Sequence, residues 1–586
     1  TGNLSLNDGT IGQNGSTLEA RGGVSISPNF DGGVVTLEIV NGSGPRSFTL
    51  DSSLHLPKLV INDPNVTINT SGSGAVAFPH QLILNAGIFN QTNDLVINAI
   101  GIGGGFCFVQ NGGTFNGSNN TITLNSNGFG SIRLTGGTFN GGSGDINLVG
   151  APADNASIIL QGGTFRSTSG NLTVPGQFGF QGAGTVFLHN GGTVTLNPGQ
   201  NQFFTADSNH PTINFNDLNL SPSNGVNYDF GIRAIIEGTL SLNEGSIGQN
   251  GSTIEARGDV SISPNFDGGF AALEYANGSG PRTFTFTPDL KPPRIVVNDP
   301  AVTLNTSGPG TVTFPQGVIL SQGTFNQNDA NLVINPPVGG GFCYLQTGGT
   351  FNGSAQTFTA NSNGFGALRM TGGVFNAGSG DINLTGTGAD ISLQGGTFTS
   401  TSGALTVPSG FRFQGAGTVF LHNNGTVNFT ATAPNFVTND SFHPNIAFNN
   451  VNINLANGVN LGLGPVMIVV GALNLNDGSV GQAGTVVEPH GPVTIGPNFD
   501  GGPTNFQFGG ASNQTFTNNG GVNPTGTWIV NKPSGVVTAA TSVILQPTQQ
   551  LNITSGTLFL GNGSDLTAGP ITIGSQGKLA ADSSQT

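Results

Sequence analysis

The chain has 586 residues, including 97 glycines, and only 7% of its residues are charged. Its net charge is −15, and its 14 Lys and Arg residues are too sparse for the basic patch that a nucleic acid or an anionic membrane requires. We expect no membrane insertion, because the longest apolar run, residues 466–470, is far shorter than the roughly 18–20 residues of a spanning helix. Phe (41 residues) far outnumbers Tyr (3) and Trp (1), which indicates interior packing rather than a stacking surface.

The first feature along the chain is a block of 30 residues that occurs three times. Residues 4–33 and 240–269 are identical at 26 of 30 positions, at an offset of 236, and residues 473–502 form a third copy 233 residues later. Repetition on this scale predicts a repeat architecture. The predicted domains are two long repeats, residues 1–236 and 237–469, and a partial third repeat, residues 470–586.

A shorter period runs inside the first two long repeats. Phe residues follow glycine-containing turns at spacings of 23 to 26 residues. Between them lie short alternating segments, such as residues 121–125 and 145–148, which are bounded by Gly, Asn and Ser and have the pattern of short β-strands. The repeated aromatic residues are Phe89, Phe115, Phe139, Phe165, Phe325, Phe351, Phe375 and Phe398.

This organisation predicts an all-β fold, a parallel β-solenoid with coils of about 25 residues. Stacked coils bring equivalent residues into rows about 4.8 Å apart, so the repeated Phe residues would form an interior ladder. Helices are disfavoured because Gly, Asn and Thr interrupt every candidate window. A β-propeller would need repeats of roughly 40–50 residues. A string of separate β-sandwiches, one or two in each long repeat, remains the alternative.

Several strand-and-turn phrases carry a family resemblance. GGTFNGS (residues 112–118), GSGDINL (142–148) and SGNLTV (169–174) resemble phrases of bacterial extracellular β-solenoid proteins. These are the autotransporter passengers and the filamentous-haemagglutinin-like adhesins. The resemblance covers most of the chain and rests on phrasing rather than on one diagnostic motif. It implies a secreted protein of the extracellular space or the cell surface.

The two cysteines, Cys107 and Cys343, are 236 residues apart and so occupy the same position in successive repeats. On a solenoid they would lie roughly 45 Å apart, whereas a disulfide needs Cα atoms within about 7 Å. We therefore expect two small buried apolar residues, with a crosslink between chains as the alternative.

Three acidic residues, Asp31, Asp267 and Asp500, belong to the repeated phrase PNFDGG. Asp followed by two glycines predicts a turn. The same carboxylates are weak candidates for binding Ca²⁺. We expect no cofactor and no other metal.

A polysaccharide-degrading β-helix enzyme is a remote alternative. Such an enzyme needs carboxylates for acid–base chemistry and cations that recognise sugar acids. The candidates recur at an offset of 236, so any site would be duplicated, whereas an enzyme usually concentrates its chemistry in one cleft. We therefore expect no catalytic activity. The candidate residues are Glu19, Glu255, Asp145, Asp381, Arg133 and Arg369.

Both ends of the sequence fall inside the long repeat and carry no evident cap. An exposed β-edge recruits another chain. The sequence therefore predicts a structural subunit of an extracellular filament, sheath or surface layer that assembles head to tail with itself. A rod-like surface adhesin, with cell-surface glycans as partners, is the alternative.

Overall fold

The computed structural model describes residues 2–12, 15–98, 105–126, 130–150, 156–248, 251–337 and 340–583. In these ranges the protein consists of parallel β-strands and turns without a helix, and the strands stack into a β-solenoid of about 25 turns. The predicted fold class is therefore confirmed. Over the same residues no helix is long and apolar enough to cross a membrane.

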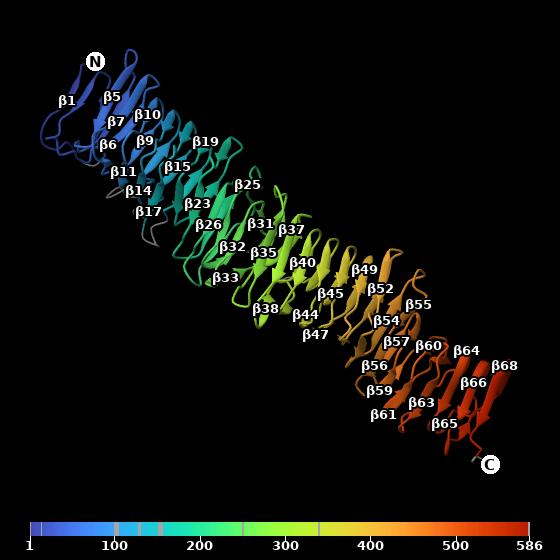
Figure 1. Ribbon diagram of the computed structural model, residues 1–586. Helices are drawn as coiled ribbons and strands as arrows, with labels where there is room; N and C mark the ends of the chain where they lie inside the picture. The colour runs from blue at the N-terminus through green and yellow to red at the C-terminus, as the bar shows by residue number, and fades with distance from the viewer. Residues whose placement is uncertain are drawn as a thin grey trace. The chain divides into compact units, whose positions relative to one another are not determined.

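The chain folds into two compact units. The first comprises Thr1–Ser279 with Leu290–Pro293, and the second comprises Gly280–Asp289 with Arg294–Thr586. In each unit the strands of neighbouring coils lie side by side, as Figure 1 shows. The two units are defined by how closely residues pack together and not by sequence repetition. They therefore do not test the repeat boundaries at residues 236 and 469, which remain a prediction from sequence.

A regular coil of the first unit has three strands, each of which belongs to a different sheet. One sheet runs from β8 (Val76–Phe78) to β32 (Val260–Ile262), and another runs from β2 (Thr17–Ala20) to β33 (Phe266–Gly269). We call the remaining one the Phe sheet. It contains β5 (Arg46–Asp51), β7 (Val66–Ser71), β10 (Ile88–Asn90), β13 (Thr114–Asn116), β16 (Thr138–Asn140), β19 (Gly163–Arg166) and β22 (Thr185–Leu188).

The second unit has a corresponding Phe sheet, and most of its other strands belong to one further sheet, whereas β65 (Val543–Ile544) and β67 (Leu566–Thr567) pair separately. That further sheet includes β36 (Arg294–Asn298) near its start and β68 (Ile571–Ala581) at its end. The Phe sheet of this unit contains β35 (Arg282–Phe286), β37 (Val302–Thr306), β40 (Thr324–Gln327), β43 (Thr350–Asn352), β46 (Val374–Asn376), β49 (Gly396–Thr399) and β52 (Thr418–Leu421).

Alternation within each short strand decides which side chains face the interior. In β10, β13 and β16 the central Phe points inward, and Phe89, Phe115 and Phe139 pair in register. Each is at most 2% exposed. The following Asn residues point outward and form their own ladder, in which Asn116 donates to Asn90 over 2.9 Å. One segment thus makes an apolar row inside and an amide row outside.

The eight repeated Phe residues form one buried row in each unit. In the first unit the ring centroids of Phe115 and Phe139 are 4.7 Å apart, as are those of Phe139 and Phe165. In the second unit Phe351 and Phe375 stack at 4.5 Å, and Phe398 lies 4.8 Å from Phe375. Rings at these distances interact favourably beyond the area that they bury.

Glycine is required at the turn before each of these Phe residues. Gly113 and Gly137 have φ values of +65° and +78°, which favour glycine. A Cβ at Gly137 would collide with the carbonyl oxygen of Gly113 in the preceding coil. The glycine-containing turns of the sequence therefore reflect close backbone stacking.

The coils average about 22 residues, fewer than the predicted 25. Paired residues in the Phe-bearing coils are 23 to 26 positions apart, as with Phe139 and Phe165. Other coils are shorter, for example where Thr17 pairs with Thr36, 19 positions later. The longer figure arose because it rested on the spacing between the repeated Phe residues, which is 23 to 26 positions.

The second copy of the 30-residue block begins on a different face of the first unit from the first copy. β31 (Thr253–Ala256) is equivalent in sequence to β2, yet it lies outside the sheet that contains β2. It stacks instead in line with β25 (Thr212–Phe215) and β28 (Arg233–Ile236). Phe215 of β25 in turn packs on Phe187 at the end of the Phe sheet, with ring centroids 5.7 Å apart. A long repeat therefore does not contain a whole number of coils.

Candidate functional site

A polar groove of about 410 Å³ lies on the outside of the second unit. Its floor is formed by β45 (Leu368–Met370), β48 (Ile391–Leu393) and β51 (Phe411–Phe413), which are successive neighbours in one sheet. The first and third residues of these strands are apolar and buried. The central residues, Arg369, Ser392 and Arg412, pair in register and line the groove. Strand spacing places the backbones of the two arginines roughly 10 Å apart.

Arg369 is held by neighbours on two sides. Its Nε donates to Oε1 of Gln394 over 2.9 Å, and Nε2 of Gln394 donates to Oε1 of Gln414 over 2.9 Å. The guanidinium carbon lies 5.6 Å from the ring centroid of Phe342. Because these contacts use Nε and the face of the group, the four N–H groups on the Nη atoms keep a fixed orientation.

Arg412 is paired with Asp390 at the groove wall. Its Nε lies 3.2 Å from Oδ2 of Asp390, and the two side chains are 54% and 14% exposed, respectively. Burial raises the pKa of Asp390 above its ordinary value, although Arg412 opposes that shift. Oδ1 of Asp390 is buried and has no hydrogen-bond partner among the described residues. Asp390 thus orients Arg412 and retains an unused acceptor.

Close packing beneath Asp390 depends on Gly366. This residue has φ +89°, and a Cβ there would collide with both Oδ1 of Asp390 and the ring of Phe342. Phe365, which precedes Gly366 in the chain, also lines the groove, and its side chain is 57% exposed. The groove therefore combines cationic, hydroxyl and amide groups with an accessible aromatic ring.

Over its described residues, the first long repeat has only part of this arrangement. Arg133, Gln161 and Gln181 repeat the same hydrogen-bond chain, with both distances again 2.9 Å. The residues in register with Arg133, however, are Ile159 and Gly179, where the second repeat has Ser392 and Arg412. The added polar groups belong to the second repeat.

Backbone hydrogen bonds identify Ser157 of the first repeat as the structural counterpart of Asp390. Its carbonyl accepts from two successive amides of the preceding coil, as the carbonyl of Ser157 does in the first repeat. Asp154, which the shared Ala–Asp sequence would align with Asp390, lies outside the described residues, as does Phe129, the counterpart of Phe365. Ser409 of the groove replaces Gly176.

The arrangement suits recognition of an anion. Two guanidinium groups face one carboxylate, which gives the groove a local positive charge in a chain whose net charge is −15. Arg binds carboxylates through paired N–H groups, which adds geometric specificity to the attraction.

The other sequence candidates for acid–base chemistry do not line this groove. Both oxygens of Glu255 are engaged, one by Arg233 at 2.6 Å and one by Arg257 at 2.7 Å. Glu19, its equivalent, pairs with Arg21 at 2.9 Å, and both of these side chains are more than half exposed.

Asp145 and Asp381 hold backbone amides of the next coil. Oδ1 of Asp145 accepts from the amide of Asn171 over 2.9 Å, and Oδ1 of Asp381 accepts from that of Ala404 over 2.8 Å. Of the six enzyme candidates, only Arg369 is part of the groove. Sequence reasoning missed Arg412 and Asp390. The available signal was that Arg412 replaces Gly179, so its charge is not repeated.

Of the three candidate Ca²⁺ ligands, Asp267 lies in strand β33 and Asp500 lies in strand β61, so the turn predicted for them is wrong, whereas Asp31 lies outside the strands. Asp267 and Asp500 accept from the amides of Gly225 and Gly458, over 3.2 and 2.9 Å, and these two glycines are equivalent positions of successive repeats. The backbone amide of Asp31 donates to the carbonyl of an earlier coil, that of Gly9. Over the described residues, no three His, Cys, Asp or Glu side chains gather as in a metal site.

Cys107 and Cys343 are free thiols without solvent exposure. Burial raises the pKa of each to about 12. Sγ of Cys343 donates to the carbonyl of Asn361 over 3.1 Å. In this state neither thiol is accessible for a bridge to another chain.

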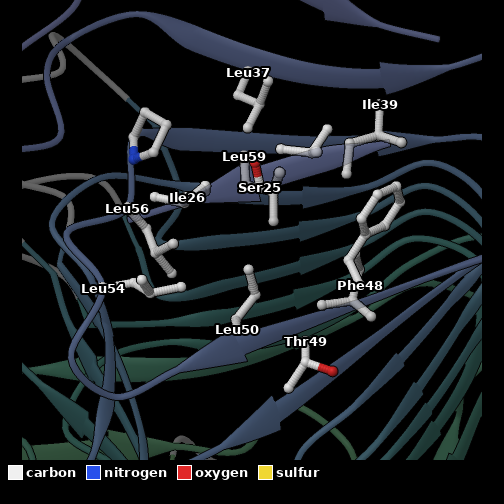
Figure 2. A pocket seen from close by; sticks show the side chains of 13 residues that line it. Ser25, Ile26, Leu37, Ile39, Phe48, Thr49, Leu50, Leu54, Leu56 and Leu59 are labelled. Atoms are coloured by element: carbon white, nitrogen blue, oxygen red, sulfur yellow. The ribbon is translucent and has the colours of Figure 1, made fainter. Parts of the chain in front are cut away.

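A second hollow, of about 270 Å³, lies in the first unit and is lined mainly by apolar side chains, with Ser25 and Thr49 also on its wall. Figure 2 shows Leu37, Ile39 and Phe48 directed at the same space as Leu50 and Leu54. It lies where β3 (Val24–Ile26) and β5 belong to separate sheets.

In the third repeat the strands equivalent to β3 and β5 pair with each other, and aromatic rings fill the space beside them. There Val493 pairs with Phe516, which joins β61 (Val493–Gly501) to β63 (Gln514–Asn518). Phe508 and Trp528 replace Ile39 and Leu59, and their ring centroids are 5.7 Å apart. Smaller side chains therefore account for the hollow in the first repeat.

Comparison with protein-family models, with curated proteins and with solved structures finds no match. The resemblance to autotransporter passengers and haemagglutinin-like adhesins is thus supported at the level of the β-solenoid fold, and no homologue supports the family itself.

Proposed function

We propose that the protein is a structural subunit of an extracellular filament, sheath or surface layer, and that its coils assemble head to tail with those of other copies. The observation that carries this proposal is the parallel stacking of successive coils inside each unit. Every regular coil presents a row of backbone amides and carbonyls to the next coil, and the interior rows continue from coil to coil. A coil of a second copy would stack by the same bonds.

Composition supports an extracellular and durable role. Low charge and few Lys and Arg residues leave few tryptic sites. Interior stacks such as Phe351 on Phe375 resist local opening, because opening would expose buried aromatic surface. We propose secretion to the cell surface or beyond on these grounds and on the family resemblance.

Electron microscopy of the purified chain at neutral pH tests the assembly. We expect long unbranched filaments with a regular axial repeat. Ile573→Lys on β68 should abolish them, because Ile573 is 50% exposed on a strand that pairs with β66 (Leu551–Leu560), and charge on an edge opposes pairing. Val186→Lys, at an outward position that is 44% exposed, is the matched control and should leave filaments intact. Separate particles in the wild-type sample would contradict the proposal.

A surface adhesin is the second candidate function, and the polar groove is the observation that favours it. An adhesin would remain unpolymerised and would bind cells or glycans. The two functions separate in the same experiment, since only the structural subunit polymerises as pure protein.

A further inference from the structure

The polar groove of the second unit carries an inference that goes beyond the structural role and does not depend on assembly. Its two arginines differ in how firmly they are held. Arg369 is fixed by Gln394 and the ring of Phe342, whereas Arg412 is more than half exposed and, among the residues that the structure describes, is anchored through Nε. The fixed guanidinium group of Arg369 and the adjustable one of Arg412 lie on strands that are separated by one strand, β48. They can each bind one carboxylate, or they can together bind a ligand that spans both.

Neutral groups around the arginines suit hydroxyls rather than a bare ion. Ser409 and the amide of Gln414 line the same groove, and each can donate and accept hydrogen bonds. Phe365 adds an exposed ring at the edge, against which the apolar face of a ring compound can pack. A small inorganic anion would use the arginines and make no use of the Ser409 hydroxyl or of Nε2 of Gln414, whose Oε1 already accepts from Gln394.

We propose that this groove binds a carboxylate-bearing saccharide, with the sugar carboxylate on Arg412 and Arg369, the sugar hydroxyls on Ser409 and Gln414, and a ring face on Phe365. Asp390 acts as a positioning residue, because it holds Nε of Arg412 and so directs the Nη atoms of that group.

Comparison of the two repeats supports a selected site rather than an accident of composition. The shared Arg–Gln–Gln chain maintains the surface in both repeats. Ser392, Ser409 and Arg412 replace Ile159, Gly176 and Gly179, and all three line one groove. Changes scattered over an outer surface would not be expected to meet in one place.

Isothermal titration with digalacturonate as the probe tests the proposal on the full chain. We expect Arg412→Gly, which restores the residue of the first repeat, to weaken binding roughly 10- to 100-fold, the loss typical of a charged hydrogen-bonded contact. Arg412→Gln provides a second variant that keeps the side-chain length. Arg133→Gln is the matched control, and it should bind as the wild type does, because the first repeat lacks the partner arginine.

Two ligand controls separate the alternatives. The dimethyl ester of digalacturonate keeps the rings and hydroxyls but loses the charge, and it should bind at least about tenfold more weakly if an arginine–carboxylate contact is made. Inorganic sulfate should bind more weakly than digalacturonate. Equal binding of the ester, equal binding of sulfate, or unchanged binding by both Arg412 variants would overturn the proposal.

Discussion

Filling the apolar hollow of the first unit should stabilise its first coils. Ile39 is 2% exposed and lines the hollow, and the third repeat has Phe508 at the same position. Ile39→Phe adds three carbon atoms, worth roughly 0.8 kcal/mol each when buried, or about 2.4 kcal/mol in total. Strain in fitting the ring reduces this gain by about 1 kcal/mol, so we expect a net stabilisation of about 1–2 kcal/mol.

Native-state hydrogen exchange is the appropriate assay, because coils of a solenoid open locally rather than all at once. A gain of this size slows exchange roughly 5- to 30-fold. The slowing should appear in peptides that contain β3 and β5, which border the hollow.

The reverse substitution in the second unit is the control. Phe508→Ile removes a ring that packs on Phe516 and Trp528 at centroid distances of 6.2 and 5.7 Å. It should speed exchange in β61 and β63. Unchanged or faster exchange around β3 and β5 in Ile39→Phe would refute the interpretation of the hollow as a packing deficit.

Three further perturbations are informative. Hydrogen bonds to Asp207, first from the amide of Gly182 and second from His210, lower the pKa of its carboxyl group. The backbone amides at this corner should therefore be protected from hydrogen exchange above about pH 4, the ordinary pKa of Asp, and should lose protection as the pH falls. Asp207→Asn should remove this pH dependence from exchange rates that are corrected for the intrinsic effect of pH. Arg46→Met should destabilise the protein by roughly 3–5 kcal/mol in denaturant unfolding, because it leaves the buried carboxylate of Asp63 without its positive partner, although the amides of Gly42 and Asn65 still donate to it. The double change Arg46→Gln with Asp63→Lys, which copies the third repeat, should recover most of the loss. Phe351→Ala should cost roughly 3–5 kcal/mol by the same measurement, since this ring is fully buried in the ladder, and a loss below about 1 kcal/mol would show that the ladder contributes little.

The charge exchange in that double change is itself a structural finding. Arg46 donates to Asp63 in the first repeat, whereas Lys532 donates to Gln514 over 2.8 Å in the third. Burial lowers the pKa of Lys532 below its ordinary value. The position thus retains a hydrogen-bonded buried pair while donor and acceptor change places.

The fold class followed from sequence because the same physical constraint recurs in successive Phe-bearing coils. Gly113 and Phe115 must occupy a turn and an inward position, so their period directly reports the stacking. Coil length was overestimated because coils without such a Phe, such as the one that pairs Thr17 with Thr36, left no equally visible mark.

The groove was not predictable by the same reasoning. Searching for what repeats finds Arg369 and Arg133 together, but the groove depends on what does not repeat, as with Arg412 in place of Gly179. Recognising that Arg369, Ser392 and Arg412 share one row also required the pairing register, which differs from a constant offset. The hollow beside Ile39 likewise needed the register between coils.

Equivalent strands of successive long repeats, such as β2 and β31, lie in different sheets because the repeat does not contain a whole number of coils. The same geometry determines how insertions and deletions would affect the surface. Because three strands make one turn of the first unit, a deletion or insertion of one strand and its corner would rotate the later outward side chains of that unit by about a third of a turn. Loss or gain of a whole coil, about 22 residues, would leave the direction of these side chains around the axis unchanged and would only shift them along it. Length variants of this chain should therefore fall into two classes, those that relocate its surface groups and those that redirect them.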